Sequence, residues 1–133
     1  MREVEKIFPR QFLEDAARQN IRLLEVRFSP DWAFRGHNLD WDAALEGLCR
    51  AKARAEAEFD MAIGFIAITS RSLGPDSCRR TVEWSVRHRD SILGIDLADS
   101  ETDFPVREFA ASVRQAQEAG LKDVVLTHPG ERV

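Results

Sequence analysis

The chain has 133 residues, of which 44% are hydrophobic and 32% are charged. This length suffices for one domain with a substantial core, and the composition is typical of a globular protein, which excludes a disordered chain. The formal net charge is -4 at pH 7, and no basic run occurs, so we expect no nucleic-acid partner. We therefore predict a single domain over residues 1–133.

The sequence shows no membrane-spanning or secretory segment. No stretch approaches the roughly 20 apolar residues that are needed to cross a bilayer. The amino-terminal sequence MREVEKIFPR is charged from its second residue and lacks the apolar centre of a signal peptide. Cys49 and Cys78 are far apart and have no CxxC spacing, which predicts reduced thiols. We expect a cytoplasmic protein without a membrane partner.

Helical and extended patterns alternate from the first unit to the last. The predicted helices share apolar residues at helical spacing and good helix formers, and in chain order they are 3–19, 40–58, 76–88 and 104–119. The predicted strands are short and rich in β-branched residues, and in chain order they are 21–29, 61–69, 91–98 and 123–128. The order of elements is therefore αβαβαβαβ.

Three of the predicted helices carry recognisable end signals. Asp40 is expected to cap the second helix, and Asp76 or Ser77 the third. The fourth helix has Pro105 near its first turn and ends at Gly120. These signals mark three predicted helix starts and one predicted helix end.

Helices between successive strands favour a parallel sheet with right-handed crossovers. Several strands also have apolar residues at consecutive positions, which is typical of strands covered on both faces. Two architectures accept four such units, a small open sheet and a part of an eight-stranded barrel. In both, ligands bind beyond the carboxyl ends of the strands.

The predicted carboxyl ends carry polar side chains that can bind ligands or take part in catalysis. In chain order these are Glu25, Arg27, Ser29, Thr69, Ser70, Arg71, Asp96, Asp99, Glu101, His128 and Glu131. A structural explanation is also open, because every strand ends in something polar. Arg27 or Arg71 could simply pair with Glu25 or Asp96 around the edge of the sheet.

Five segments resemble the metal-dependent adenosine deaminase family, in its order and spacing. They are EVRFSP (25–30), ITSRSLGPDSC (68–78), GIDLAD (94–99), FPVREFAASVRQAQEAGL (104–121) and THPGE (127–131). The resemblance implies an α/β fold with parallel strands, about half of a (β/α)8 TIM barrel, in which this chain supplies the second to fifth strands. It also implies zinc-dependent hydrolytic deamination of adenosine or a related aminopurine nucleoside or base.

The resemblance assigns roles to four residues. His128 matches a zinc ligand of the family, and Glu131 matches the acid that gives a proton to the purine ring. Gly130 lets the intervening loop turn tightly beside the substrate. Asp99 stands where the family has a glycine whose backbone approaches the substrate, so we expect a substrate-binding position that carries an additional side chain.

The metal site implied by the resemblance is incomplete in this sequence. A catalytic zinc needs about three protein ligands, whereas His128 is the only credible ligand. We therefore expect the isolated chain to be inactive and its chemistry to require further segments. One alternative is a non-catalytic half-barrel that binds a partner or forms a homo-oligomer through exposed sheet edges. Another is a small nucleotide- or phosphate-binding domain, although the chain has no glycine-rich phosphate loop.

Overall fold

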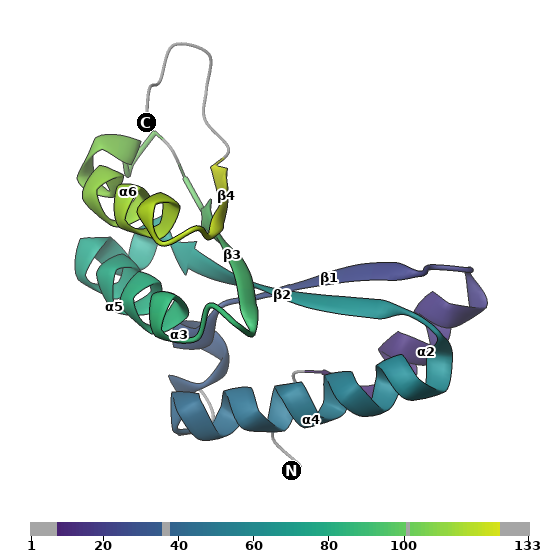
Figure 1. The fold of residues 1–133 in the computed structure, drawn as a ribbon. Helices are drawn as coiled ribbons and strands as arrows, with labels where there is room; N and C mark the ends of the chain where they lie inside the picture. Colours follow the sequence, from purple (N-terminus) through teal and green to yellow (C-terminus); the bar gives the residue numbers. More distant parts are fainter. Residues whose placement is uncertain (1–7, 36–37, 101, 126–133) are drawn as a thin grey trace. The chain divides into compact units, whose positions relative to one another are not determined.

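The computed structural model describes residues 8–35, 38–100 and 102–125 of the chain, with side chains as far as Lys122 (Figure 1). Helices and strands alternate along it. In chain order the elements are α2 (Arg10–Arg18), β1 (Leu23–Phe28), α3 (Pro30–Ala33), α4 (Trp41–Phe59), β2 (Ala62–Ser70), η2 (Arg71–Leu73), α5 (Gly74–Arg87), β3 (Ile92–Ala98), η3 (Val106–Glu108), α6 (Ala110–Glu118) and β4 (Lys122–Val125). None of the described helices is long and apolar enough to cross a membrane.

The predicted parallel arrangement is confirmed for two pairs of neighbouring strands. The strands form a sheet in the order β1-β2-β3-β4, and both the β2–β3 and the β3–β4 pairs are parallel. The chain divides into two compact units. Unit 1 comprises residues 1–26 and 32–64, and unit 2 comprises residues 27–31 and 65–133.

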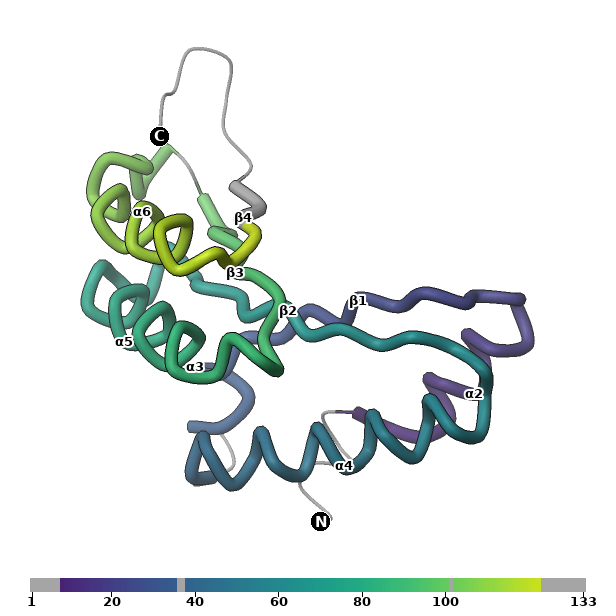
Figure 2. Tube along the Cα trace, in the orientation of Figure 1, coloured from purple at the N-terminus to yellow at the C-terminus, as the bar shows by residue number. Residues whose placement is uncertain are grey.

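Unit 2 is built on the parallel strands, with α5 and α6 packed against them. Figure 2 shows the chain passing from β3 through α6 and back into β4, so the helix connects two parallel strands. Helix α5 contacts β3, and α6 contacts both α5 and β4. The core between these elements is apolar and consists of Cys78, Val82, Ile95, Leu97, Val106, Phe109, Ala116 and Leu121.

A close approach of β3 to β4 explains the glycine within GIDLAD. Gly94 lies opposite Lys122 in the parallel register. A Cβ atom built on Gly94 would lie 2.5 Å from the Lys122 carbonyl oxygen, which is too close for any real side chain. In the β2–β3 pair, the register shifts between Phe65 and Ile66 of β2. Strand β3 therefore has one additional residue opposite this point.

Unit 1 is held together by α2 packing on α4. Leu13 and Ala16 of α2 are buried, as expected for the apolar face of an amphipathic helix. Asp40 accepts a hydrogen bond from the Ala43 N–H at 2.9 Å, which confirms the predicted cap. Helix α4 ends before Asp60, whose left-handed backbone (φ 50°) terminates the helical hydrogen-bond pattern before β2.

Two predicted helix starts are wrong. Helix α5 begins at Gly74, before Asp76 and Ser77, because Pro75 fits the first helical turn, where its missing N–H costs nothing. The helix predicted at 104–119 has instead a 3-10 turn after Pro105, and α6 starts only at Ala110. Its predicted end is confirmed, since Gly120 has a positive φ of 85° just after the last turn.

Candidate functional site at the strand ends

The carboxyl ends of β1, β2 and β3 bring polar residues together within unit 2. Arg27 comes from the end of β1, Thr69 and Arg71 from the end of β2, and Asp96 and Asp99 from the end of β3. Parallel strands place these ends at one edge of a sheet, where α/β proteins bind their ligands. The contacts of these side chains show which of them hold the strand ends together and which remain available to a ligand.

Asp96 is fully buried and forms an ion pair with Arg27. Nη2 of Arg27 contacts Oδ2 of Asp96, whose side chain is 0% exposed, whereas the Arg27 side chain is 49% exposed. Neither Asp96 oxygen accepts a hydrogen bond from a described residue, so the Arg27 guanidinium is the main compensation for this buried charge. The sequence left this pairing open as a structural alternative, and the structure confirms it.

Thr69 and Arg71 tie neighbouring strand ends to each other. The Thr69 hydroxyl donates to the Asp96 carbonyl oxygen at 3.1 Å, from a buried position. Arg71 is fully buried, and its Nη1 donates to the Phe104 carbonyl oxygen at 2.8 Å. Arg71 therefore holds the loop that follows β3 against the end of β2. Both side chains therefore stabilise the backbone at the ends of the strands.

Asp99 remains exposed and lies in a left-handed backbone conformation, with φ at 89°. This conformation strongly favours glycine, although aspartate tolerates it better than most residues. Its carboxylate accepts a hydrogen bond from the Ser72 hydroxyl and another from the Ser100 N–H at 3.0 Å. The bond from Ser72, followed by that from Ser100, holds the pKa of the Asp99 carboxyl below its ordinary value.

A second buried carboxylate, Asp31, was missed by the sequence interpretation. It follows β1 in the short helix α3 and is 3% exposed. The Ser77 hydroxyl donates to Asp31 Oδ2, and Arg80 Nη2 lies 2.8 Å from the same oxygen. Both partners come from α5, so Asp31 fastens the segment after β1 to this helix. No local pattern announces this contact, because 46 and 49 residues separate the partners.

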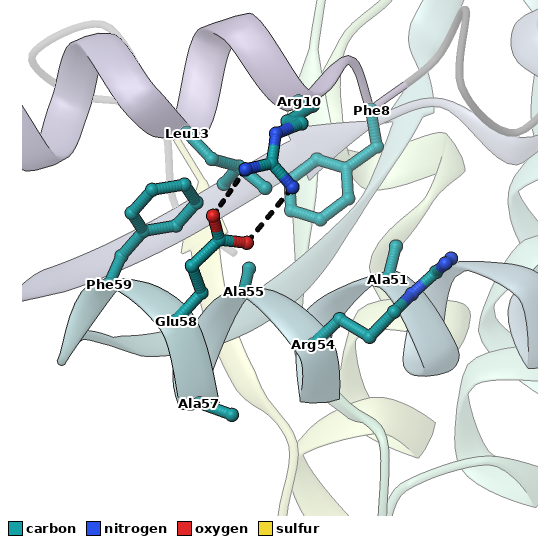
Figure 3. Close-up of a pocket in the computed structure, with 9 residues that line it drawn as sticks. All are labelled: Phe8, Arg10, Leu13, Ala51, Arg54, Ala55, Ala57, Glu58 and Phe59. Carbon is teal, nitrogen blue, oxygen red and sulfur yellow. Dashed lines mark hydrogen bonds and ion pairs between the residues drawn. The ribbon is translucent and has the colours of Figure 1, made fainter.

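A pocket in unit 1 has a different character (Figure 3). It has a volume of about 460 Å³ and lies between α2 and α4, with Phe8, Leu13, Ala55 and Phe59 among its apolar lining residues. Arg10 reaches across to Glu58, with Nη1 2.9 Å from Oε2, and its guanidinium also lies over the Phe59 ring. These contacts join the two helices, and the pocket includes none of the strand-end residues.

The three remaining predicted site residues, His128, Gly130 and Glu131, lie outside the described residues. The described part of the chain contains no group of three or more His, Cys, Asp or Glu side chains placed to hold a metal ion. The two buried carboxylates of the strand ends are engaged by arginines instead. The described residues therefore do not fit a zinc site by themselves.

The sequence is similar to known deaminases along nearly its whole length. A sequence model of the family described as adenosine deaminase matches residues 2–133. Adenosine deaminase from Erwinia tasmaniensis is 35% identical over 119 residues, and adenosine deaminase from Shigella flexneri is 33% identical over 119 residues. Each alignment covers 90% of this chain and 35% of the relative. The chain therefore spans about a third of the length of the curated relatives it matches.

Solved structures share the fold. Adenine deaminase from Arthrobacter aurescens superposes with a TM-score of 0.79 at 25% identity, covering 92% of this chain and 37% of that chain. An amidohydrolase from Burkholderia ambifaria with bound zinc gives 0.79 at 27% identity, covering 86% and 32%. Arabidopsis ADAL in complex with GMP gives 0.69 at 22% identity, covering 92% and 39%, which shows the fold alone. The predicted fold is thus confirmed as part of a (β/α)8 barrel.

Proposed function

We propose that this chain forms part of an aminohydrolase acting on adenosine or a related aminopurine. The proposal starts from the fact that the chain belongs to the adenosine deaminase family. The family match over residues 2–133 carries this proposal. The geometry supports it, because the polar ends of β1, β2 and β3 lie where barrel enzymes build their active sites. The proposed partner is a small purine compound, either a nucleoside or a base.

The proposed catalytic residues lie within residues 128–131. In the proposed site the imidazole of His128 would bind a metal ion, and Glu131 would deliver a proton to a ring nitrogen of the purine. Gly130 would allow the loop between them to turn. A bound zinc supplies an activated water, and the zinc-bound amidohydrolase relative supports such a cofactor.

The described residues have roles that can be derived directly. Arg27 and Asp96 fix the end of β1 to the end of β3, and Arg71 fixes the loop after β3. They therefore hold the loop carrying Asp99 in a defined position, which a site that orients a substrate requires. Asp99 is exposed at the end of β3, and its carboxylate accepts hydrogen bonds from Ser72 and Ser100. We assign it to the substrate-binding edge.

Reconstitution tests this function. The chain would be assayed with adenosine and zinc, first alone and then mixed with the Erwinia tasmaniensis relative from which the matching segment has been deleted. We expect the chain alone to be inactive and the mixture to release ammonia, with the intact relative as the positive control. His128→Ala and Glu131→Gln should abolish the activity of the mixture. Inactivity of a mixture that co-elutes as one complex would contradict the proposal.

The second candidate is a non-catalytic half-barrel, since β1 and β4 are the outer strands of the described sheet. An incomplete barrel leaves strand edges that can pair with another chain. Two copies joined at these edges would form a homo-oligomer. Sedimentation velocity over a wide concentration range distinguishes the candidates. A concentration-dependent dimer, together with an inactive reconstituted mixture, would favour the half-barrel, whereas a monomer at all concentrations would exclude self-association.

A further inference from the structure

We propose that the pocket between α2 and α4 of unit 1 binds a small carboxylate with an unbranched apolar chain, a class that octanoate represents. Apolar side chains of the two helices would hold the chain of this ligand, and Arg54 would meet its carboxylate. The pocket includes none of the strand-end residues, so this site is independent of the proposed function.

The walls of the pocket suit an elongated apolar group. Phe8, Leu13 and Ala55 are buried and line it, together with Ala51 and Phe59. The three lining residues of α4 recur every four positions, so they follow one face of the helix over about 12 Å. The small side chains at Ala51 and Ala55 leave room between the helices. A volume of about 460 Å³ is typical of pockets that bind small molecules.

Two of the charged side chains around the pocket already neutralise each other. Nη1 of Arg10 lies 2.9 Å from Oε2 of Glu58, and its Nη2 donates to Oε1 of the same carboxylate. The Arg10 Nε also donates to Glu14 at 2.8 Å. Figure 3 shows both contacts between Arg10 and Glu58. A cationic ligand would therefore find the Glu58 carboxylate occupied, which disfavours a cation as the ligand.

Arg54 supplies the charge that a carboxylate can meet. It is exposed on α4 and makes no hydrogen bond or ion pair with the other lining residues drawn in Figure 3. Helical side chains lean toward the amino terminus of their helix, and the figure shows the Arg54 guanidinium near Ala51. The carboxylate of the ligand is therefore expected at the Ala51 end of the pocket, with its apolar chain directed toward Phe59.

Titration of the ¹⁵N-labelled 133-residue chain with octanoate, and separately with uncharged octanamide, tests the proposal. We expect octanoate to shift the amide signals of Leu13, Ala51 and Ala55, and to bind about fivefold more tightly than octanamide at low ionic strength. Arg54→Gln should abolish this preference, and added salt should reduce it in the unmodified chain. Arg114→Gln removes the same formal charge from an exposed position on α6 and should leave the preference unchanged.

A second variant separates the shape of the pocket from its charge. Ala51→Leu places a larger side chain in the pocket from a half-buried position, so it should weaken both ligands alike. The dispersion of the same spectra verifies that each variant is folded. The absence of shifts in unit 1, or equal affinity of the unmodified chain for the two ligands, overturns the proposal. An unchanged preference in Arg54→Gln overturns it as well. None of these results alters the deaminase proposal, which an activity measurement tests.

Discussion

The two compact units use charged residues in different ways. In unit 1 the Arg10–Glu58 pair joins α2 to α4 with side chains that are 65% and 42% exposed. In unit 2 the Arg27–Asp96 and Arg80–Asp31 pairs involve carboxylates that are 0% and 2% exposed. Water solvates the first pair with or without its partner, whereas a buried carboxylate depends on its arginine. Similar chemical pairs therefore contribute very differently to the two units.

This difference also bears on function. In unit 1 a solvent-exposed ion pair joins α2 to α4, and the interface between these helices is largely apolar. Unit 2 places buried charges at the ends of its parallel strands, where an apolar core residue would be expected on grounds of stability alone. Buried charge retained at a strand end is typical of an edge that must hold polar loops in position.

Arg27→Ala is expected to have the largest effect on stability. It leaves the Asp96 carboxylate buried without its cation, so unfolding free energy should fall by about 2–3 kcal/mol, somewhat less than for a fully buried pair because Arg27 is half exposed. Urea denaturation measures the loss. The double variant Arg27→Ala, Asp96→Asn should recover much of it, because the remaining amide carries no charge. An Arg27→Ala protein as stable as the unmodified chain would remove the distinction between the units.

Gly94→Ala tests whether unit 2 depends on close backbone approach as well as on charge. The new Cβ would lie 2.5 Å from the Lys122 carbonyl oxygen, and β4 must move away to relieve the overlap. We expect a loss of about 1–3 kcal/mol in unfolding free energy. Gly120→Ala is a useful comparison, since a Cβ there meets nothing within 4 Å and its cost comes from the positive φ alone. Hydrogen exchange of the β4 amides should accelerate in Gly94→Ala and stay slow in Gly120→Ala.

The cysteines provide one chemical probe in each unit. Cys49 of unit 1 is half-buried, whereas Cys78 of unit 2 is buried, and burial raises the pKa of the Cys78 thiol. Because the thiolate is the reactive form, Cys49 should react with a thiol reagent at least about tenfold faster at pH 8. Mass spectrometry of the partly labelled chain measures the two rates. Equal rates in the native protein would contradict the buried position of Cys78.

Arg10→Ala should change stability very little. The guanidinium is exposed and its partners, Glu58 and Glu14, are solvated in its absence. The loss in unfolding free energy should be close to the measurement error and should shrink further in high salt. Leu13→Ala is the matched control on the same helix, because it removes buried apolar surface from α2 and should be clearly destabilising. A larger loss for Arg10→Ala than for Leu13→Ala would reverse our interpretation of unit 1.

The smallest effect concerns the pH dependence of Asp99. Its pKa is lowered in the folded chain, so ionisation stabilises the fold above the ordinary carboxyl pKa of the unfolded chain, and this contribution is lost as pH falls through the lowered value. The stability difference between the unmodified chain and Asp99→Asn should therefore be present at neutral pH and disappear in acid. Thermal unfolding from pH 2 to 7 measures it. A difference that grows in acid would have the wrong sign.

Much of the fold follows from local sequence signals. Asp40 and Gly120 mark helix ends through chemistry that involves only neighbouring residues, and both predictions are confirmed. The predicted starts of α5 and α6 were wrong, because Pro75 and Pro105 are compatible with several geometries of a first turn. Local signals therefore fix the type and order of elements more firmly than their boundaries.

The site was predictable in its position and only partly in its contacts. Alternating helices and strands indicate that Arg27, Thr69 and Asp96 share one edge, whatever their individual roles. Their partners depend on register and on burial, which no local pattern encodes. The bond between Ser72 and Asp99 joins residues 27 positions apart and exists because the ends of β2 and β3 lie side by side. The burial and ion pair of Asp31 could not be predicted locally, because they depend on how α5 packs against it.

The left-handed backbone at Asp99 restricts which residues can replace it. Glycine and asparagine are the replacements that this conformation tolerates best, and each is one base change away from either aspartate codon. β-branched residues would strain the loop. Mutation can therefore remove the charge at this edge in a single step, without passing through a poorly folded intermediate. The charge at the end of β3 can therefore change while the fold that carries it stays the same.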